Sequence, residues 1–199
     1  MRSATSENDT RRRRRRRAQI LAIYTLIAIG LAWFFESQAT TTIIFVRHAE
    51  KAVDGGSDPG LSAAGRRRVA ELTRQLVDAD VVAGIDAIYV TQYKRTQETA
   101  RPLADALDLP VNQYDAADTE AVLETILKRH KGKIILVVGH SNTLPVLIAN
   151  LGASKKVPPI AEDEFDNIYV ISIPWFGKTK TIRLRIGEPY HAPEEPAES

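Results

Sequence analysis

Four side chains in this sequence could together act on a phosphate group: Arg47, His48, Arg95 and His140. Arg47 and His48 follow an apolar run at residues 42–46, and His140 follows another at 134–138. Guanidinium groups donate paired hydrogen bonds to phosphate oxygens and stay charged at any relevant pH. An imidazole in line with the leaving group can attack phosphorus and form a phosphohistidine, which water then hydrolyses. These residue types indicate phosphoryl chemistry with a histidine nucleophile.

The two apolar runs must bring His48 and His140 together for such a site to exist. Both runs are rich in β-branched residues and lack polar alternation, which is typical of strands buried on both faces of a sheet. Ligands of open α/β sheets bind beyond the carboxyl ends of the strands. If the runs are neighbouring strands, the two histidines meet at one edge. A lone histidine at a strand end usually only hydrogen-bonds a carbonyl group, but here two arginines accompany the pair.

The rest of the domain alternates between strand and helix patterns. Helices are predicted at 62–77, 96–107, 119–130 and 143–151, and strands at 42–46, 87–90, 134–138, 168–173 and 180–186. The last strand alternates polar and apolar residues, as an edge strand would. Trp175 and Phe176, between the last two strands, are expected to pack against the sheet. The pattern predicts an α/β fold, a three-layer sandwich with a mostly parallel central sheet.

Composition and charge exclude several functional classes. The chain has no cysteine, so thiolate nucleophiles, disulfides and cysteine-ligated metals are ruled out. No carboxylate cluster accompanies the four site residues, and we expect neither a metal nor another cofactor. Residues 1–40 hold eight arginines against three acidic residues, a balance of +5 that leaves −3 for residues 41–199. A mildly acidic domain is a poor candidate for nucleic-acid binding.

An apolar segment near the N-terminus follows an unbroken arginine run. The run covers residues 11–17, and residues 18–35 are almost entirely apolar. A helix of that length spans roughly 27 Å, which is close to the ~30 Å thickness of the hydrocarbon core. Each arginine costs roughly 2.5 to 3.5 kcal/mol at the membrane centre, so the run should stay in the cytoplasm.

We therefore expect a single-pass cell-membrane protein with its domain on the extracytoplasmic side. The expected parts are a cytoplasmic basic segment at 1–17, a transmembrane anchor or signal segment at 18–35, a folded domain at 40–187 and a flexible tail at 188–199. The alternative is a signal peptide cleaved near Ala39, which would give a secreted or periplasmic protein. An arginine run can also be a nuclear or nucleic-acid-binding tail, but the apolar segment beside it favours the membrane.

Four ordered motifs resemble branch 1 of the histidine phosphatase superfamily, the phosphoglycerate-mutase-like group. They are Phe45-Val-Arg-His-Ala49, Leu61-Ser-Ala-Ala-Gly65, Thr91 to Ala100, and Val138-Gly-His-Ser141. The resemblance implies a phosphoglycerate mutase-like fold with His48 as the nucleophile. It also implies Arg47, Arg95 and His140 around the phosphate. Asn142 is a further phosphate-binding candidate, because backbone N–H groups at a helix start attract anions.

The acid that would protonate the leaving group is left open. The family's usual glutamate lies in an insert after the second arginine, and this sequence lacks that insert. The candidates are Glu50, beside the nucleophile, and Asp115, Asp118 and Glu120 further along the chain. Asp118 could equally cap the helix that follows it, and Asp115 could form a turn.

The sequence thus predicts a metal-independent phosphatase, exported or membrane-anchored, that hydrolyses phosphomonoesters through a phosphohistidine. Its partner would be a phosphorylated small molecule or a cell-envelope substrate. The short chain also resembles compact family members that act on phosphohistidine proteins, and small exported members proposed to act on envelope sugar phosphates. The missing insert argues against a mutase. The intact histidines argue against a non-catalytic phosphate-binding module, although that alternative is retained, and the oligomeric state is open.

Overall fold

The computed structural model describes residues 3–37, 40–53, 56–78, 84–153 and 156–187. The chain divides into two units, Met1–Ala39 and Thr40–Ser199. The predicted flexible tail at 188–199 and the alternative cleavage position at Ala39 lie outside the described residues.

The N-terminal unit contains one helix, α1 (Ser3–Ser37). Its segment Arg12–Phe35 is long and apolar enough to cross a membrane, judged by length and composition. The helix includes the predicted apolar segment and continues N-terminally through the arginine run. Arginine has a high helix propensity, so the basic run does not end the helix.

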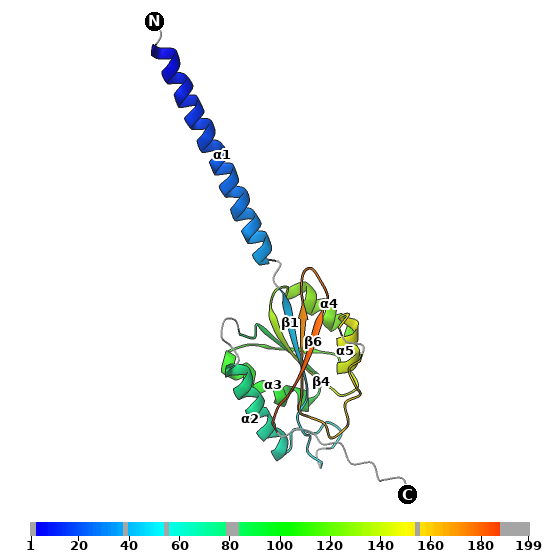
Figure 1. Ribbon diagram of the computed structural model, residues 1–199. Helices are drawn as coiled ribbons and strands as arrows, with labels where there is room; N and C mark the ends of the chain where they lie inside the picture. Colours follow the sequence, from blue (N-terminus) through cyan, green and yellow to red (C-terminus); the bar gives the residue numbers. More distant parts are fainter. Residues whose placement is uncertain (1–2, 38–39, 54–55, 79–83, 154–155, 188–199) are drawn as a thin grey trace. The chain divides into compact units, whose positions relative to one another are not determined.

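A six-stranded sheet forms the centre of the second unit (Figure 1). Its strands are β1 (Thr41–Arg47), β2 (Ala87–Thr91), β3 (Val111–Tyr114), β4 (Ile134–Gly139), β5 (Asn167–Ile173) and β6 (Lys180–Arg185). They lie in the order β3-β2-β4-β1-β5-β6. The first four are parallel to one another, β5 is antiparallel to β1, and β6 is antiparallel to β5. Strands β1 and β4 are direct neighbours, as the predicted site requires, and β6 is an edge strand, as predicted.

Helices cover both faces of the sheet, which confirms the predicted three-layer sandwich. Helices α2 (Ala63–Asp78) and α3 (Lys94–Leu107) lie on one face, and α4 (Thr119–Arg129) and α5 (Leu144–Asn150) on the other (Figure 1). Along β4, Ile135 and Val137 pack in the core beneath α4 and α5, whereas Leu136 and Val138 pack beneath α2 and α3. Because β4 is covered on both faces, its sequence shows no polar alternation.

Strand β3 departs from the predicted element order. Its four residues include Asn112 and Gln113, and it lies at the sheet edge beside β2. A short strand of which half is polar carries no apolar run that would reveal it. The boundaries of the other predicted elements agree with the structure to within one or two residues.

The segment Leu61–Gly65 fastens the start of α2 to the loop that follows β1. The backbone N–H of Ser62 donates to the carbonyl oxygen of Glu50 (2.8 Å), and its hydroxyl accepts the N–H of Gly65 (3.0 Å). The hydroxyl thereby caps the helix. A Cβ at Gly65 would overlap the Glu50 carbonyl oxygen. Glycine is required here because helix and loop backbones approach so closely.

We predict that Gly65→Ala lowers the free energy of unfolding by about 1 to 3 kcal/mol, because the added methyl group overfills this contact. Helix propensity alone would change the free energy of unfolding in the opposite direction, because alanine is the better helix former by about 1 kcal/mol. Chemical unfolding of the purified protein measures the change. The control is Ala70→Gly at an exposed position of the same helix, which should cost only the propensity difference. A Gly65→Ala protein as stable as the wild type would contradict the close approach.

Candidate active site

The pairing of β1 with β4 sets His48 beside His140. Arg47 is the register partner of Gly139, and the backbone N–H of His48 donates to the Gly139 carbonyl oxygen (3.0 Å). The centroids of the two imidazole rings are 5.3 Å apart. Two residues that are distant in the sequence thus meet at the carboxyl end of the parallel strands.

The imidazole of His48 is held in one tautomer. Its Nδ1 lies 2.8 Å from the carbonyl oxygen of Ala49. A carbonyl oxygen only accepts hydrogen bonds, so Nδ1 carries the proton and Nε2 keeps its lone pair. Burial lowers the pKa of His48 to about 3, and the charge of Arg47 acts in the same direction. The ring is therefore neutral at pH 7, as a nucleophile must be.

His140 has the opposite arrangement of its ring nitrogens. A guanidinium nitrogen of Arg95 lies 3.4 Å from Nδ1, and the hydroxyl of Thr91 lies 3.0 Å from Nε2. Because a guanidinium only donates, Nδ1 accepts and Nε2 donates to Thr91. The Thr91 hydroxyl is in turn 2.9 Å from that of Thr96, which donates to the Tyr93 carbonyl oxygen (2.7 Å). Burial, followed by the charge of Arg95, lowers the pKa of His140 to about 4.

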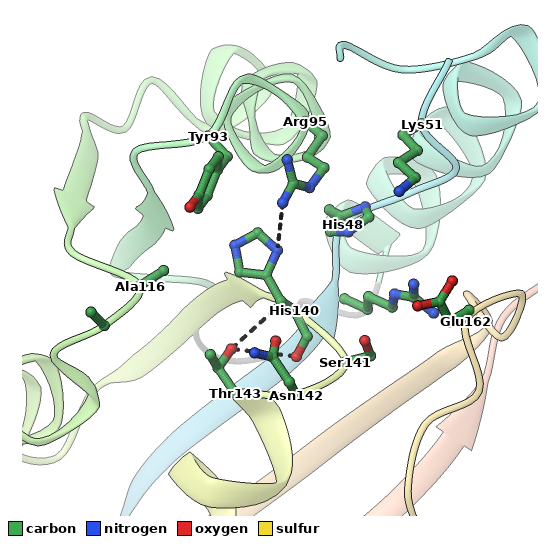
Figure 2. Close-up of a pocket in the computed structure, with 12 residues that line it drawn as sticks. His48, Lys51, Tyr93, Arg95, Ala116, His140, Ser141, Asn142, Thr143 and Glu162 are labelled. Carbon is green, nitrogen blue, oxygen red and sulfur yellow. Dashed lines mark hydrogen bonds between the residues drawn. The ribbon is translucent and has the colours of Figure 1, made fainter. Parts of the chain in front are cut away.

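Arg95 is positioned by the first turn of α3. Its guanidinium carbon lies 4.4 Å from the ring centroid of Tyr93, and a terminal nitrogen lies 3.6 Å from the carboxylate of Asp58. Asp58 also accepts the backbone N–H of Lys94 at the start of the helix (3.2 Å). These contacts hold the guanidinium toward His140 (Figure 2).

Arg47 connects the site to the loop that precedes β5. Its Nη1 donates to the carbonyl oxygens of Ala161 (2.6 Å) and Glu164 (2.9 Å), and its guanidinium lies 4.1 Å from the ring centroid of Phe165. Among the described residues, its buried Nε has no hydrogen-bond partner. Burial lowers the pKa of Arg47 below the ordinary arginine value, but the guanidinium stays charged at neutral pH.

The four predicted residues line one cavity of about 400 Å³. Its wall is mostly polar and consists of Arg47, His48, Lys51, Tyr93, Arg95, Ala116, Ala117, His140, Ser141, Asn142, Thr143 and Glu162 (Figure 2). Two guanidinium groups and two neutral imidazoles at one end of a cavity suit a phosphate dianion. Within the part of the chain that the structure describes, no group of three or more His, Cys, Asp or Glu side chains could hold a metal ion.

The motif Thr91 to Ala100 supports the backbone beside His48 from α3. The hydroxyl of Thr99 accepts the backbone N–H of Ala49 (3.0 Å) and donates to the Arg95 carbonyl oxygen (2.7 Å). Ala49 is 2% exposed. Thr99 therefore links the residue after His48 to the turn that carries Arg95, which explains the position of this threonine in the motif.

The four candidate proton donors do not line the cavity. Glu50 pairs with Arg68 at 2.7 Å, and Asp115 accepts the backbone N–H of Ala117 (2.9 Å) in a turn. Asp118 caps α4 by accepting the N–H of Ala121 (3.0 Å), and Glu120 is exposed in the first turn of that helix. The structural roles foreseen for the two aspartates are thus present.

Glu162 is a cavity residue that sequence reasoning missed. Among the described residues that line the cavity it is the one carboxylate, and Figure 2 shows it on the same side as His48. It lies in the loop whose carbonyl groups Arg47 holds. Acidic residues crowd this stretch, but nothing in the spacing relates it to His48, since only the tertiary contact with Arg47 brings it there.

Asn142 also lines the cavity, together with Ser141 and Thr143. The backbone N–H of Thr143 donates to the His140 carbonyl oxygen (3.2 Å), as does that of Leu144 (3.0 Å). Those two N–H groups are therefore engaged in the turn after β4. Asn142 itself remains the candidate for a phosphate contact from this turn.

Comparison with known proteins supports a family assignment. The model of the histidine phosphatase superfamily (branch 1) matches residues 43–118, which contain three of the four motifs. None of the curated protein sequences compared with this chain matches it significantly.

Solved structures share the fold at low sequence identity. The protein histidine phosphatase SixA, solved with tungstate, is 20% identical, with a TM-score of 0.58, over 72% of this chain and 96% of its own. The phosphoglycerate mutase of Plasmodium falciparum is 19% identical, with a TM-score of 0.53, over 81% and 99%. The mycobacterial glucosyl-3-phosphoglycerate phosphatase is 14% identical, with a TM-score of 0.53, over 67% and 90%. The predicted phosphoglycerate mutase-like fold is confirmed.

The family model covers His48, which directly follows β1, and Arg95 in the first turn of α3, and the fold brings the fourth motif to the same cavity. Residues 43–118 match branch 1 of the histidine phosphatase superfamily, which confirms the predicted resemblance over this part of the chain, and the domain shares its fold with the solved phosphatases and the mutase.

Proposed function

We propose that this protein is a phosphatase that hydrolyses phosphomonoesters through a phosphohistidine on His48. The observation that carries the proposal is a neutral imidazole, with its lone pair on Nε2, in one cavity with His140, Arg47 and Arg95. The match of residues 43–118 to the histidine phosphatase model supports phosphatase chemistry. A phosphorylated small molecule or cell-envelope molecule is the proposed substrate class.

In the first step, Nε2 of His48 attacks phosphorus, the N–P bond forms and the ester P–O bond breaks. The leaving oxygen takes a proton and departs as an alcohol. In the second step, water attacks phosphorus, the N–P bond breaks and inorganic phosphate leaves. The water gives up one proton, and Nε2 regains its lone pair.

Arg47, Arg95 and His140 have the electrostatic role in this proposal. Negative charge on the equatorial oxygens of the transferring group is offset by the two guanidinium groups. A bound dianion also favours protonation of His140, which would then donate to a phosphate oxygen. Asn142 is proposed as a further donor from the turn after β4. Two fixed cations at the site lead us to expect activity without added metal.

Glu162 is our proposed acid for the leaving group. It lines the cavity, and Arg47 holds the loop that carries it. A carboxyl group here could give its proton to the leaving oxygen and receive one from the attacking water. The assignment has a direct consequence for substrate choice, because poor alkoxide leaving groups need such an acid.

A phosphohistidine protein phosphatase is the second candidate. The four carboxylates considered from the sequence lie outside the cavity, and a phosphoramidate needs little help from an acid because its nitrogen departs readily. The mutase is disfavoured because the insert is absent. A non-catalytic binding module would have no use for the free lone pair on His48.

We also propose that the domain is anchored at the cell membrane and lies on its extracytoplasmic side. The support is the apolar length of α1 and the arginine run before it, which costs too much to translocate.

We predict that the full-length protein in detergent hydrolyses an activated aryl phosphate, and that His48→Ala lowers kcat by about 10³-fold or more by removing the nucleophile. Circular dichroism of the variant checks that the fold is intact. EDTA should leave the wild-type rate unchanged. Acid quenching destroys a phosphohistidine whereas base preserves it, so labelled phosphate should remain on His48 only in base. Full activity of the folded variant would refute the mechanism.

The lowered pKa values of His48 and His140, about 3 and about 4, predict stability that falls on acidification. Below the ordinary histidine pKa of 6.5, the unfolded chain binds protons that the folded chain does not. Each histidine should therefore cost about 1.4 kcal/mol per pH unit below that value until its folded pKa is reached. The free energy of unfolding at pH 7 and pH 5, in phosphate-free buffer, measures the slope.

The free energy of unfolding of the variant His140→Asn should decrease less between pH 7 and pH 5 than that of the wild type, because only one buried histidine then contributes to the decrease. Inorganic phosphate should reduce the wild-type slope, since a bound dianion stabilises the imidazolium form. Equal slopes in variant and wild type would show that His140 is not buried in its neutral form.

We predict that Glu162→Gln lowers kcat for an alkyl phosphate about 10²-fold, because the alkoxide then leaves without a proton. An activated aryl phosphate and a phosphoramidate should be affected far less. Asp163→Asn is the matched control: the residue is exposed in the same loop and does not line the cavity. Equal losses on all three substrates would contradict an acid role and indicate that Glu162 shapes the cavity instead.

A further inference from the structure

The turn between β5 and β6 exposes aromatic side chains that the sequence pattern predicts to be packed. Phe176 is 89% exposed and Trp175 is 54% exposed. The prediction that these rings pack against the sheet is wrong for Phe176 and holds at most for part of Trp175. Gly177 follows with φ +118, a backbone conformation that favours glycine, so the turn is sharp behind the aromatic pair.

This turn lies at the end of the sheet where β1 begins. Thr41 is the register partner of Ile173, the last residue of β5. A groove beside the turn is lined by Thr40, Ser172, Pro174, Phe176, Gly177, Lys178 and Lys180. The first residue of the domain and the exposed ring of Phe176 therefore line the same groove. The cavity with His48 lies at the other end of β1.

Covalent continuity limits how far this end of the domain can be from a bilayer that holds the N-terminal segment. The apolar span ends at Phe35, and Thr40 follows five residues later. Five residues of fully extended chain reach at most about 18 Å. If the apolar segment spans a bilayer, this length of chain keeps Thr40 within reach of the headgroup region.

The chemistry of the turn fits a lipid–water interface. Tryptophan is enriched at the level of the headgroups, where its ring is partly apolar and its N–H is hydrated. Lys178 is exposed, as is Lys180 at the start of β6, and a basic side chain near an anionic surface contributes to binding. Aromatic rings flanked by lysines are the residue types that interfacial anchors use.

We infer that the turn from Pro174 to Lys180 docks on the anionic surface of the bilayer that holds α1, with Trp175 and Phe176 among the headgroups. The domain then has one membrane-facing end and one catalytic end. Seven residues of β1 separate them, which at about 3.3 Å per residue is roughly 20 Å or more. This inference rests on the proposed anchoring and adds to the proposed function that the substrate reaches the site from the aqueous side.

The test uses the full-length chain with Trp33→Phe, which leaves Trp175 as its one tryptophan. The protein is reconstituted into vesicles of equimolar phosphatidylcholine and phosphatidylglycerol, with bromine at shallow acyl positions. We expect the Trp175 emission to shift to shorter wavelength and to lose about half of its intensity relative to unbrominated vesicles, as an interfacial indole would. The double variant Lys178→Glu/Lys180→Glu should lose much of this quenching.

The matched control places a tryptophan at the catalytic end. Val53, which follows β1 and is 98% exposed, becomes Trp in a Trp33→Phe/Trp175→Phe background and should be quenched by acrylamide in water but not by brominated lipid. Equal quenching of the two tryptophans by brominated lipid would overturn the inference. A Trp175 shielded from acrylamide yet unquenched by lipid would also overturn it, and would indicate a protein partner or a second copy.

Hydrolysis of a soluble aryl phosphate by the same vesicles separates this inference from the proposed function. Activity without lipid quenching refutes only the docking. Lipid quenching without activity refutes only the phosphatase.

Discussion

The pairing of β1 with β4 is the interaction on which the rest of the site depends. The register that opposes Arg47 to Gly139 and bonds the His48 N–H to the Gly139 carbonyl sets two imidazoles side by side. A slip of one residue would turn every side chain of β1 to the other face of the sheet. The register is held because Ile43 and Phe45 fill one core and Val46 fills the other.

Burial at this sheet edge has a chemical effect as well as a structural one. It keeps both imidazoles neutral beside two permanent cations, so the cavity is suited to an anion and resists protonation of its histidines. Arg47 serves both purposes, since it faces the cavity and also holds the carbonyl groups of Ala161 and Glu164. Through that contact, the position of the Arg47 guanidinium in the cavity and the position of Glu162 are coupled.

The two ends of the sheet have different surroundings. At the carboxyl end of β1, the loops that follow the four parallel strands line a polar cavity. At the opposite end, the β5–β6 turn presents aromatic and basic side chains next to the first residue of the domain. An antiparallel hairpin added to a parallel sheet makes this possible, because it returns the chain to the end away from the ligand site. The proposed membrane-facing turn and the proposed catalytic cavity therefore lie at opposite ends of one strand.

The sequence by itself determined the layer architecture, the boundaries of the predicted helices and strands of the domain to within two residues, and the four residues that line one cavity. Those features depend on local apolar spacing and on short motifs, which a sequence displays directly. Strand β3, the cavity position of Glu162 and the exposure of Phe176 were decided by the tertiary structure. Each of these three features depends on contacts with residues that are distant in the sequence. The spacing of apolar residues and the short motifs do not indicate such contacts.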